Sequence, residues 1–169
     1  MNIFLKIIFL TLFLLVALNL NVYTQIIKVV KTDHLLELLN TNDDTVRIIN
    51  FWASWCRPCI KELPVFDSLN IAFTEKNVKI ILINVDLPAN LPKVSAFVKR
   101  HGIFSEVLLL SAGSPKTWVR KIRPEWSGSL PATIITAHGR LYEIFLNGSI
   151  TYAEIYAQTE IYLEKLLHR

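Results

Sequence analysis

Continuous hydrophobic runs and helix-spaced hydrophobic positions alternate along this chain. Residues 46–53 and 78–85 are almost continuously apolar, which predicts two strands buried on both faces of a sheet. Between them, apolar side chains recur at helical spacing, at Ile60, Leu63, Phe66, Leu69 and Phe73. A strand, a helix and a second strand joined by short turns predict a right-handed βαβ unit, and hence an α/β domain.

Further elements are predicted on both sides of this unit. Before it, a short strand over residues 26–30 precedes a helix over 34–39 that Thr32 or Asp33 would cap. After it, we expect a helix over 93–100, a strand over 104–110, a helix over 116–122, and strands over 132–136 and 141–146. A capping box at Thr151 and Glu154 then opens a C-terminal helix.

The N-terminal segment has a different pattern. Residues 7–18 form an apolar run broken only by Thr11, with Lys6 before it and polar residues after it. Such a run is short for a membrane span, which needs about 20 residues, so we interpret residues 1–24 as a secretory signal. An uncleaved membrane anchor is the alternative; a buried helix fits poorly because the run has no polar face. Either leading interpretation places a domain over residues 25–169 outside the cytoplasm, in the periplasm or cell envelope, secreted or membrane-anchored.

Size and charge narrow the class of protein. The chain has 169 residues, which allows one domain once a targeting segment is set aside. Its net charge of +4 is modest and its 18 basic residues are spread along the chain, so nucleic acid is not an expected partner. Both cysteines of the chain lie in one Cys-x-x-Cys motif, which is no disulfide framework.

Cys56 and Cys59 lie where a predicted strand ends and a helix begins. A helix N-terminus carries partial positive charge and free N–H groups, which stabilise a thiolate, and Arg57 adds a fixed charge. Pro58 lies in the first turn, where its missing N–H has no consequence. We therefore expect Cys56 to be the more exposed thiol and the nucleophile, and Cys59 to resolve a mixed disulfide.

Two other interpretations of the cysteine pair are weaker. A structural disulfide rarely closes so short a loop, because little entropy is removed from the unfolded chain. A zinc site needs about four ligands, and none of His34, His101, His138 and His168 is paired with another at ligand spacing. A redox-active pair with no bound metal is the favoured interpretation.

The run Asn50-Phe51-Trp52-Ala53-Ser54-Trp55-Cys56-Arg57-Pro58-Cys59, followed by Glu62 and Pro64, resembles the active site of the TlpA/ResA-like thiol–disulfide oxidoreductases of the bacterial envelope. These belong to the thioredoxin superfamily. The resemblance implies a thioredoxin fold, with a central mixed β-sheet flanked by helices. It implies no cofactor, because electrons travel through the thiols. It also implies disulfide-bearing protein substrates and, for a reductase, a membrane electron donor; cytochrome c biogenesis is a family-level association.

The resemblance also assigns roles to individual residues. Glu62 is expected to take the proton that Cys59 loses, although spacing alone favours an ordinary surface Glu. Asn50 stands where thioredoxins usually carry a buried Asp, and an amide cannot act as a base. Pro131 corresponds to the cis-proline that faces the cysteines, with Leu130 pairing with an extended substrate. Trp55 is expected to shape the substrate groove.

Two segments depart from a minimal thioredoxin. The helix and strand over residues 93–110 resemble the insertion of the TlpA/ResA-like group, as partner surface or as plain scaffold. The stretch before the active-site strand is shorter than in that group and resembles the strand–helix–strand start of a plain thioredoxin.

Two function hypotheses follow. The first is an extracytoplasmic thiol–disulfide oxidoreductase that reduces disulfides of envelope proteins. The second is a non-catalytic factor that handles copper or haem proteins through the same cysteines, since copper(I) prefers thiolates. Met1 is the only Met of the chain, so no Met–His cluster supports the second.

Overall fold

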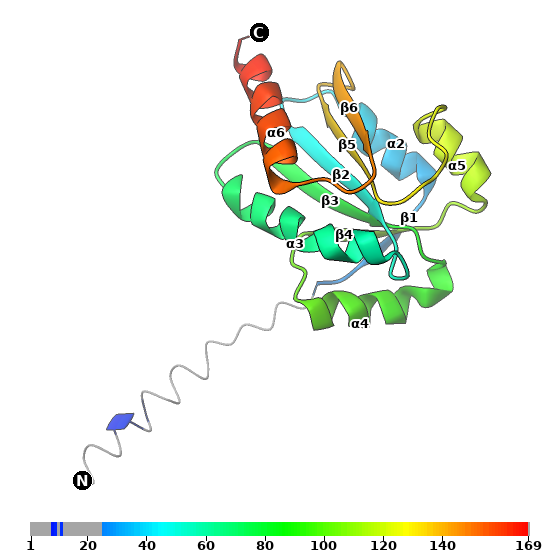
Figure 1. The fold of residues 1–169 in the computed structure, drawn as a ribbon, viewed down its shortest axis with the longest axis vertical. Coiled ribbons are helices and arrows are strands. Elements are labelled where there is room, and N and C mark those ends of the chain that lie inside the picture. The colour runs from blue at the N-terminus through cyan, green and yellow to red at the C-terminus, as the bar shows by residue number, and fades with distance from the viewer. Residues whose placement is uncertain (1–7, 10, 12–24, 169) are drawn as a thin grey trace.

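The described part of the chain folds around one six-stranded mixed sheet (Figure 1). The computed structural model describes residues 8, 9, 11 and 25–168. Its strands are β1 (Lys28–Val30), β2 (Val46–Trp52), β3 (Val78–Asn84), β4 (Glu106–Leu110), β5 (Ala132–Ala137) and β6 (Tyr142–Asn147). Their spatial order is β1-β4-β3-β2-β5-β6; the first four are parallel, and β5 and β6 pair antiparallel.

Helices cover both faces of the sheet, as Figure 1 shows. They are α2 (Thr32–Asn40), α3 (Arg57–Ala72), α4 (Leu91–His101), α5 (Pro115–Ile122) and α6 (Tyr152–Leu167), with a short 3₁₀ turn η1 (Pro88–Asn90) before α4. One buried cluster joins α3, α4 and α6 to the sheet, and a second joins α2 and α5 to the opposite face. The expected α/β architecture with a strand–helix–strand unit, β2-α3-β3, is confirmed.

Side chains along the central strands point alternately to the two faces of the sheet, which explains why a buried cluster forms on each face. In β2, Ile48 belongs to the α3 side and Ile49 to the α2 side, and both are fully buried. Successive strand side chains point to opposite faces, so a strand covered on both faces must be apolar throughout. All seven residues of β2 are buried, including its two polar residues, Arg47 and Asn50.

The predicted insertion lies inside the sheet. Its strand β4 pairs with β3 on one side and with β1 on the other. Residues Val107 to Leu110 are buried, so β4 is scaffold and not partner surface. Its helix α4 ends at Gly102, which adopts the left-handed conformation that glycine favours at this position.

The start of α2 corrects one expectation. Thr32 and Asp33 do not cap this helix but lie in its first turn; the N-cap is Lys31, without a side-chain cap bond. The register of β1 on β4 carries the strand to Val30, whose carbonyl accepts the Ser111 N–H at 2.7 Å. The chain therefore turns into the helix one residue earlier than a Thr32 cap requires and two residues earlier than an Asp33 cap requires.

The predicted targeting segment, residues 1–24, lies outside the described residues except for 8, 9 and 11, and its nature stays a prediction. Within the described ranges, none of the helices has the length and apolar character that crossing a bilayer demands.

Candidate active site

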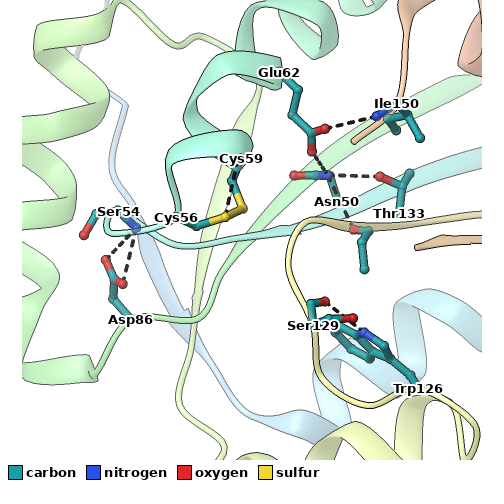
Figure 2. The surroundings of a disulfide bond; sticks show 11 residues. Asn50, Ser54, Cys56, Cys59, Glu62, Asp86, Trp126, Ser129, Thr133 and Ile150 are labelled. Carbon is teal, nitrogen blue, oxygen red and sulfur yellow. Dashed lines mark hydrogen bonds between the residues drawn. A yellow bond between two sulfur atoms is a disulfide. The ribbon is translucent and has the colours of Figure 1, made fainter. Parts of the chain in front are cut away.

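The two cysteines lie at the junction of β2 and α3 and are joined by a disulfide in this structure (Figure 2). Cys56 is the N-cap of α3, and its sulfur accepts the Cys59 N–H at 3.3 Å. Cys59 is fully buried, whereas Cys56 is 6 % exposed. The geometry agrees with the expected order of exposure; the assignment of nucleophile and resolving thiol stays a prediction.

The turn before the helix is built from local hydrogen bonds. Ala53 accepts the Cys56 N–H at 3.1 Å, and Cys56 in turn accepts the Ile60 N–H at 3.1 Å, which starts the helical ladder. Arg57 and Pro58 are exposed at the first turn. Free N–H groups and the helix dipole therefore point at the Cys56 sulfur, which is the arrangement that lowers a thiol pKa.

A cleft of about 380 Å³ opens at Trp55, the residue that precedes Cys56. Trp55, 70 % exposed, and Leu130 both line it, so the structure brings together two of the predicted substrate-binding residues. The Leu130–Pro131 peptide bond is cis, as expected from the resemblance. The other walls come from loops after β3 and β4 and from the start of α5, and include Leu87, Pro88, Ala112, Pro115 and Trp118. A larger hollow of about 640 Å³, lined by Asp44, Lys76 and the end of α6, contains none of the predicted site residues.

Glu62 is a residue of α3 whose side chain is buried, so the interpretation of Glu62 as an ordinary surface residue is wrong. It is 4 % exposed, and its two oxygens accept the Asn50 side-chain amide at 2.9 Å and the Ile150 N–H at 3.3 Å (Figure 2). Burial raises the pKa of the Glu62 carboxyl, and the bonds from Asn50 and Ile150 oppose that shift. A buried acid one helical turn from Cys59 has the chemistry of a proton acceptor, although that role stays a prediction.

Asn50 connects Glu62 to the neighbouring strand. Its amide nitrogen also donates to Thr133 Oγ1 at 3.0 Å, and the two residues face each other in the β2–β5 register. Asn50 Oδ1 is buried without a hydrogen-bond partner. A protonated Glu62 therefore has an unused acceptor among its neighbours.

Trp126, a residue of the loop before β5, packs in the core. It is 3 % exposed, its indole N–H donates to Ser129 O at 3.0 Å, and its ring lies 4.8 Å from that of Phe51. It therefore supports the loop that carries Leu130 and does not line the cleft.

Sequence reasoning missed three contributors to this site. Thr133 is one of two threonines in an otherwise apolar strand, and pairing it with Asn50 would have indicated a buried polar contact. Leu87 is an exposed apolar residue in a loop, a signal too common to single out. Asp86 is buried and accepts the Ser54 N–H, although an acid at the end of a predicted strand is more often an ordinary loop or cap residue. No cluster of three or more His, Cys, Asp or Glu side chains at metal-binding distance occurs among the residues described.

This chain matches one protein family and is similar to several thiol-disulfide oxidoreductases. The family described as AhpC/TSA matches residues 28–141. The sporulation thiol-disulfide oxidoreductase A of Bacillus subtilis is 39% identical over 67 residues, covering 39% of this chain and 41% of the relative. The thiol-disulfide oxidoreductase ResA of Halalkalibacterium halodurans is 33% identical over 101 residues, covering 59% of this chain and 53% of the relative. The chain thus spans about half the length of these relatives.

Two solved structures are also similar to this chain. The crystal structure of StoA from Bacillus subtilis matches with a TM-score of 0.56 and 26% identity, over 70% of this chain and 84% of that chain. A thiol:disulfide interchange protein of the thioredoxin family from Chlorobium tepidum matches with a TM-score of 0.58 and 22% identity, over 75% of this chain and 83% of that chain. The expected thioredoxin fold and the resemblance to ResA-like proteins are confirmed.

Proposed function

Because the chain belongs to the AhpC/TSA family, we propose that it is a thiol–disulfide oxidoreductase that reduces disulfides of protein substrates through Cys56 and Cys59. The observation that carries this proposal is the cysteine pair itself. It is bonded at the N-terminus of α3 and directly follows Trp55, which lines a cleft together with Leu130. The thiol–disulfide oxidoreductases among its relatives support the same activity.

The proposed cycle exchanges one disulfide for another. The Cys56 thiolate attacks a sulfur of the substrate disulfide, which forms a mixed disulfide and releases one substrate thiolate. Cys59, after losing its proton to Glu62, attacks the Cys56 sulfur and releases the second substrate thiolate. Two electrons have passed to the substrate, and an external dithiol must return two electrons to the Cys56–Cys59 disulfide before the next turnover.

Three parts of the site support these steps. The Cys59 N–H that lies 3.3 Å from the Cys56 sulfur stabilises a thiolate there. The exposed Trp55 ring and Leu130 offer apolar contact and backbone pairing to an extended substrate segment. Burial raises the pKa of Glu62, which brings this carboxyl closer to the pKa of a thiol and makes it a better proton acceptor.

We place the reaction outside the cytoplasm, on envelope proteins, with the electron donor in the membrane. The apolar run over residues 7–18 supports export, and a reductase in an oxidising compartment needs a dedicated electron supply. Residues 1–24 act in this proposal as a signal or as a membrane anchor. Fractionation of cells that express the full chain, followed by an alkaline wash, separates the two: an anchored protein stays with the membrane and a secreted one does not.

Serine variants of the two cysteines test the activity. Insulin reduction with dithiothreitol as donor should fall to the uncatalysed rate in Cys56→Ser, because the remaining thiol, Cys59, is fully buried and cannot reach a substrate disulfide. Cys59→Ser should accumulate a mixed disulfide with substrate, detectable by mass spectrometry, because no thiol resolves it. Full activity of Cys56→Ser would contradict the proposal. Stoichiometric copper retained by a wild-type protein without reductase activity would favour the binding alternative.

The reduction potential of the Cys56/Cys59 couple decides the direction of electron flow. A value near about −270 mV, that of thioredoxin, would support a reductase. A value near about −120 mV would indicate an oxidant that inserts disulfides, and the direction proposed here would be reversed.

A further inference from the structure

The backbone ladder between β2 and β3 ends where the active-site turn begins. Trp52 and Asn84 are the last register pair, and the Val85 N–H donates to Trp52 O at 2.9 Å. In a parallel pair the next bond would join the Ser54 N–H to a main-chain carbonyl of the facing strand. Here a side chain takes that place: the Ser54 N–H donates to the two carboxylate oxygens of Asp86, at 3.3 Å each (Figure 2).

Asp86 is itself held in place and buried. It is 3 % exposed, and its own N–H donates to Asn84 Oδ1 at 3.0 Å. No Lys, Arg or His forms an ion pair with it within residues 25–168. Acidic side chains are almost never buried without a partner, so the contact with Ser54 accounts for the position of this carboxylate.

The contact acts on the turn that presents the nucleophile. Ser54 lies inside the turn closed by the Cys56 N–H and Ala53 O, and Cys56 is the N-cap of α3. Ser54 is half-buried, and an N–H that leaves a sheet without full access to water needs another acceptor, or its desolvation opposes folding. The Asp86 carboxylate supplies that acceptor, so the chain can leave the sheet at Ser54 and turn into the helix.

We propose that Asp86 is a positioning residue for the thiol exchange, which holds the turn Ala53–Cys56 through the Ser54 N–H. This inference rests on the proposed function for its catalytic readout. Asp86 also has an electrostatic consequence. A carboxylate beside the turn opposes a thiolate on Cys56 and so disfavours the reduced state relative to the disulfide.

Two substitutions of Asp86 separate the effect of its hydrogen bond to Ser54 from the effect of its negative charge. Asn at position 86 keeps an oxygen that accepts the Ser54 N–H but removes the negative charge, whereas Ala removes both. Asp86→Ala should lower kcat/KM for disulfide reduction about tenfold, and Asp86→Asn should stay within about threefold of wild type. Both should shift the equilibrium with glutathione towards the dithiol, by about fivefold, because both remove the charge.

Asp67 provides a matched control. Its carboxylate also accepts a backbone N–H, that of Ser105 at 2.9 Å, but at a loop away from the cysteines. Asp67→Ala should therefore leave the glutathione equilibrium constant unchanged. If Asp67→Ala changes this constant as much as Asp86→Ala does, the effect comes from losing any loop contact and our inference about Asp86 is wrong.

Amide hydrogen exchange keeps the inference testable apart from activity. The Ser54 amide should exchange faster in Asp86→Ala than in wild type, and at the wild-type rate in Asp86→Asn. If the wild-type protein reduces no disulfide, the proposed function fails, while the exchange rates and the glutathione equilibrium still test the contact. If Asp86→Ala does not fold, the wild-type Ser54 amide still tests the contact, because exchange at the rate of an unprotected amide would overturn it. Asp86→Asn then tests only the charge, through the glutathione equilibrium. Wild-type values in every assay for the folded variants would overturn the inference.

Discussion

At the scale of single residues, polar side chains inside apolar strands contact each other in the candidate active site. Asn50 and Thr133 face each other in neighbouring strands, and the Asn50 amide donates both to Thr133 and to the buried Glu62. Glu62 was expected at the site because of its place in the motif, but its partners are Asn50 on β2 and the Ile150 N–H, which lies 88 residues further along the chain. Local spacing carries no information about such partners, which is why it favoured a surface position.

Glu62 should give the stability of the protein a distinctive pH dependence. Burial raises the pKa of its carboxyl above the usual 4.5, so between these two values the folded state binds more protons than the unfolded state. Stability is then greatest below the usual pKa and is lost as the pH rises through the raised one. Glu62→Gln should remove this loss, as measured by urea unfolding of the oxidised protein at a series of pH values above 4.5.

The exposed Glu164 gives a comparison for that experiment. Glu164→Gln should retain the wild-type decline, because its carboxyl lies at the surface of α6. An identical decline in the Glu62→Gln variant would show that Glu62 does not bind the additional proton.

At the scale of elements, most helices and strands follow from periodicity and from their ends. The C-terminal helix α6 begins with the predicted capping box: Thr151 Oγ1 accepts the Glu154 N–H at 3.3 Å, and the Glu154 carboxylate accepts the Thr151 N–H at 2.7 Å. The start of α2 could not be predicted in this way. Three consecutive residues, Lys31, Thr32 and Asp33, are polar, and only the register of β1 on β4 selects the N-cap among them.

Loss of the Thr151 cap should destabilise the protein measurably. Thr151→Ala removes the acceptor for the Glu154 N–H and should lower the free energy of unfolding by about 1 kcal/mol in urea titrations. Thr151→Ser keeps the hydroxyl and should lie within about 0.5 kcal/mol of wild type. Equal losses in the two variants would mean that the methyl group, and not the cap, is responsible.

At the scale of the molecule, the order of strands is the feature that the sequence could not supply. Periodicity predicted a strand over residues 104–110 but not its place between β1 and β3. The continuous apolar character of Glu106–Leu110 after its first residue was the available signal, because only a central strand needs apolar side chains on both faces. In the structure, Leu108 packs with the α2 and α5 side and Leu109 with the α3 and α6 side.

The inserted strand should therefore be as stable as the rest of the sheet. Leu109→Ala should cost about 2–5 kcal/mol in the free energy of unfolding, with a single urea transition, because a fully buried leucine leaves a cavity in the shared core. Ile71→Ala, at a side chain that is 66 % exposed, should change the free energy by less than about 1 kcal/mol. A separate early transition in Leu109→Ala would instead identify α4 and β4 as an independent unit.

The hydrogen bond between Gln25 and the segment after α4 has a practical consequence. The Gln25 side-chain amide donates to Ser105 O at 2.8 Å, just ahead of β1 and β4. Parallel strands begin at one edge of a sheet, whereas Cys56 follows the opposite end of β2. A bead, a fluorophore or a fusion protein joined ahead of Gln25 would consequently leave the disulfide unobstructed, so immobilisation by the N-terminus is the orientation in which captured partners can reach it.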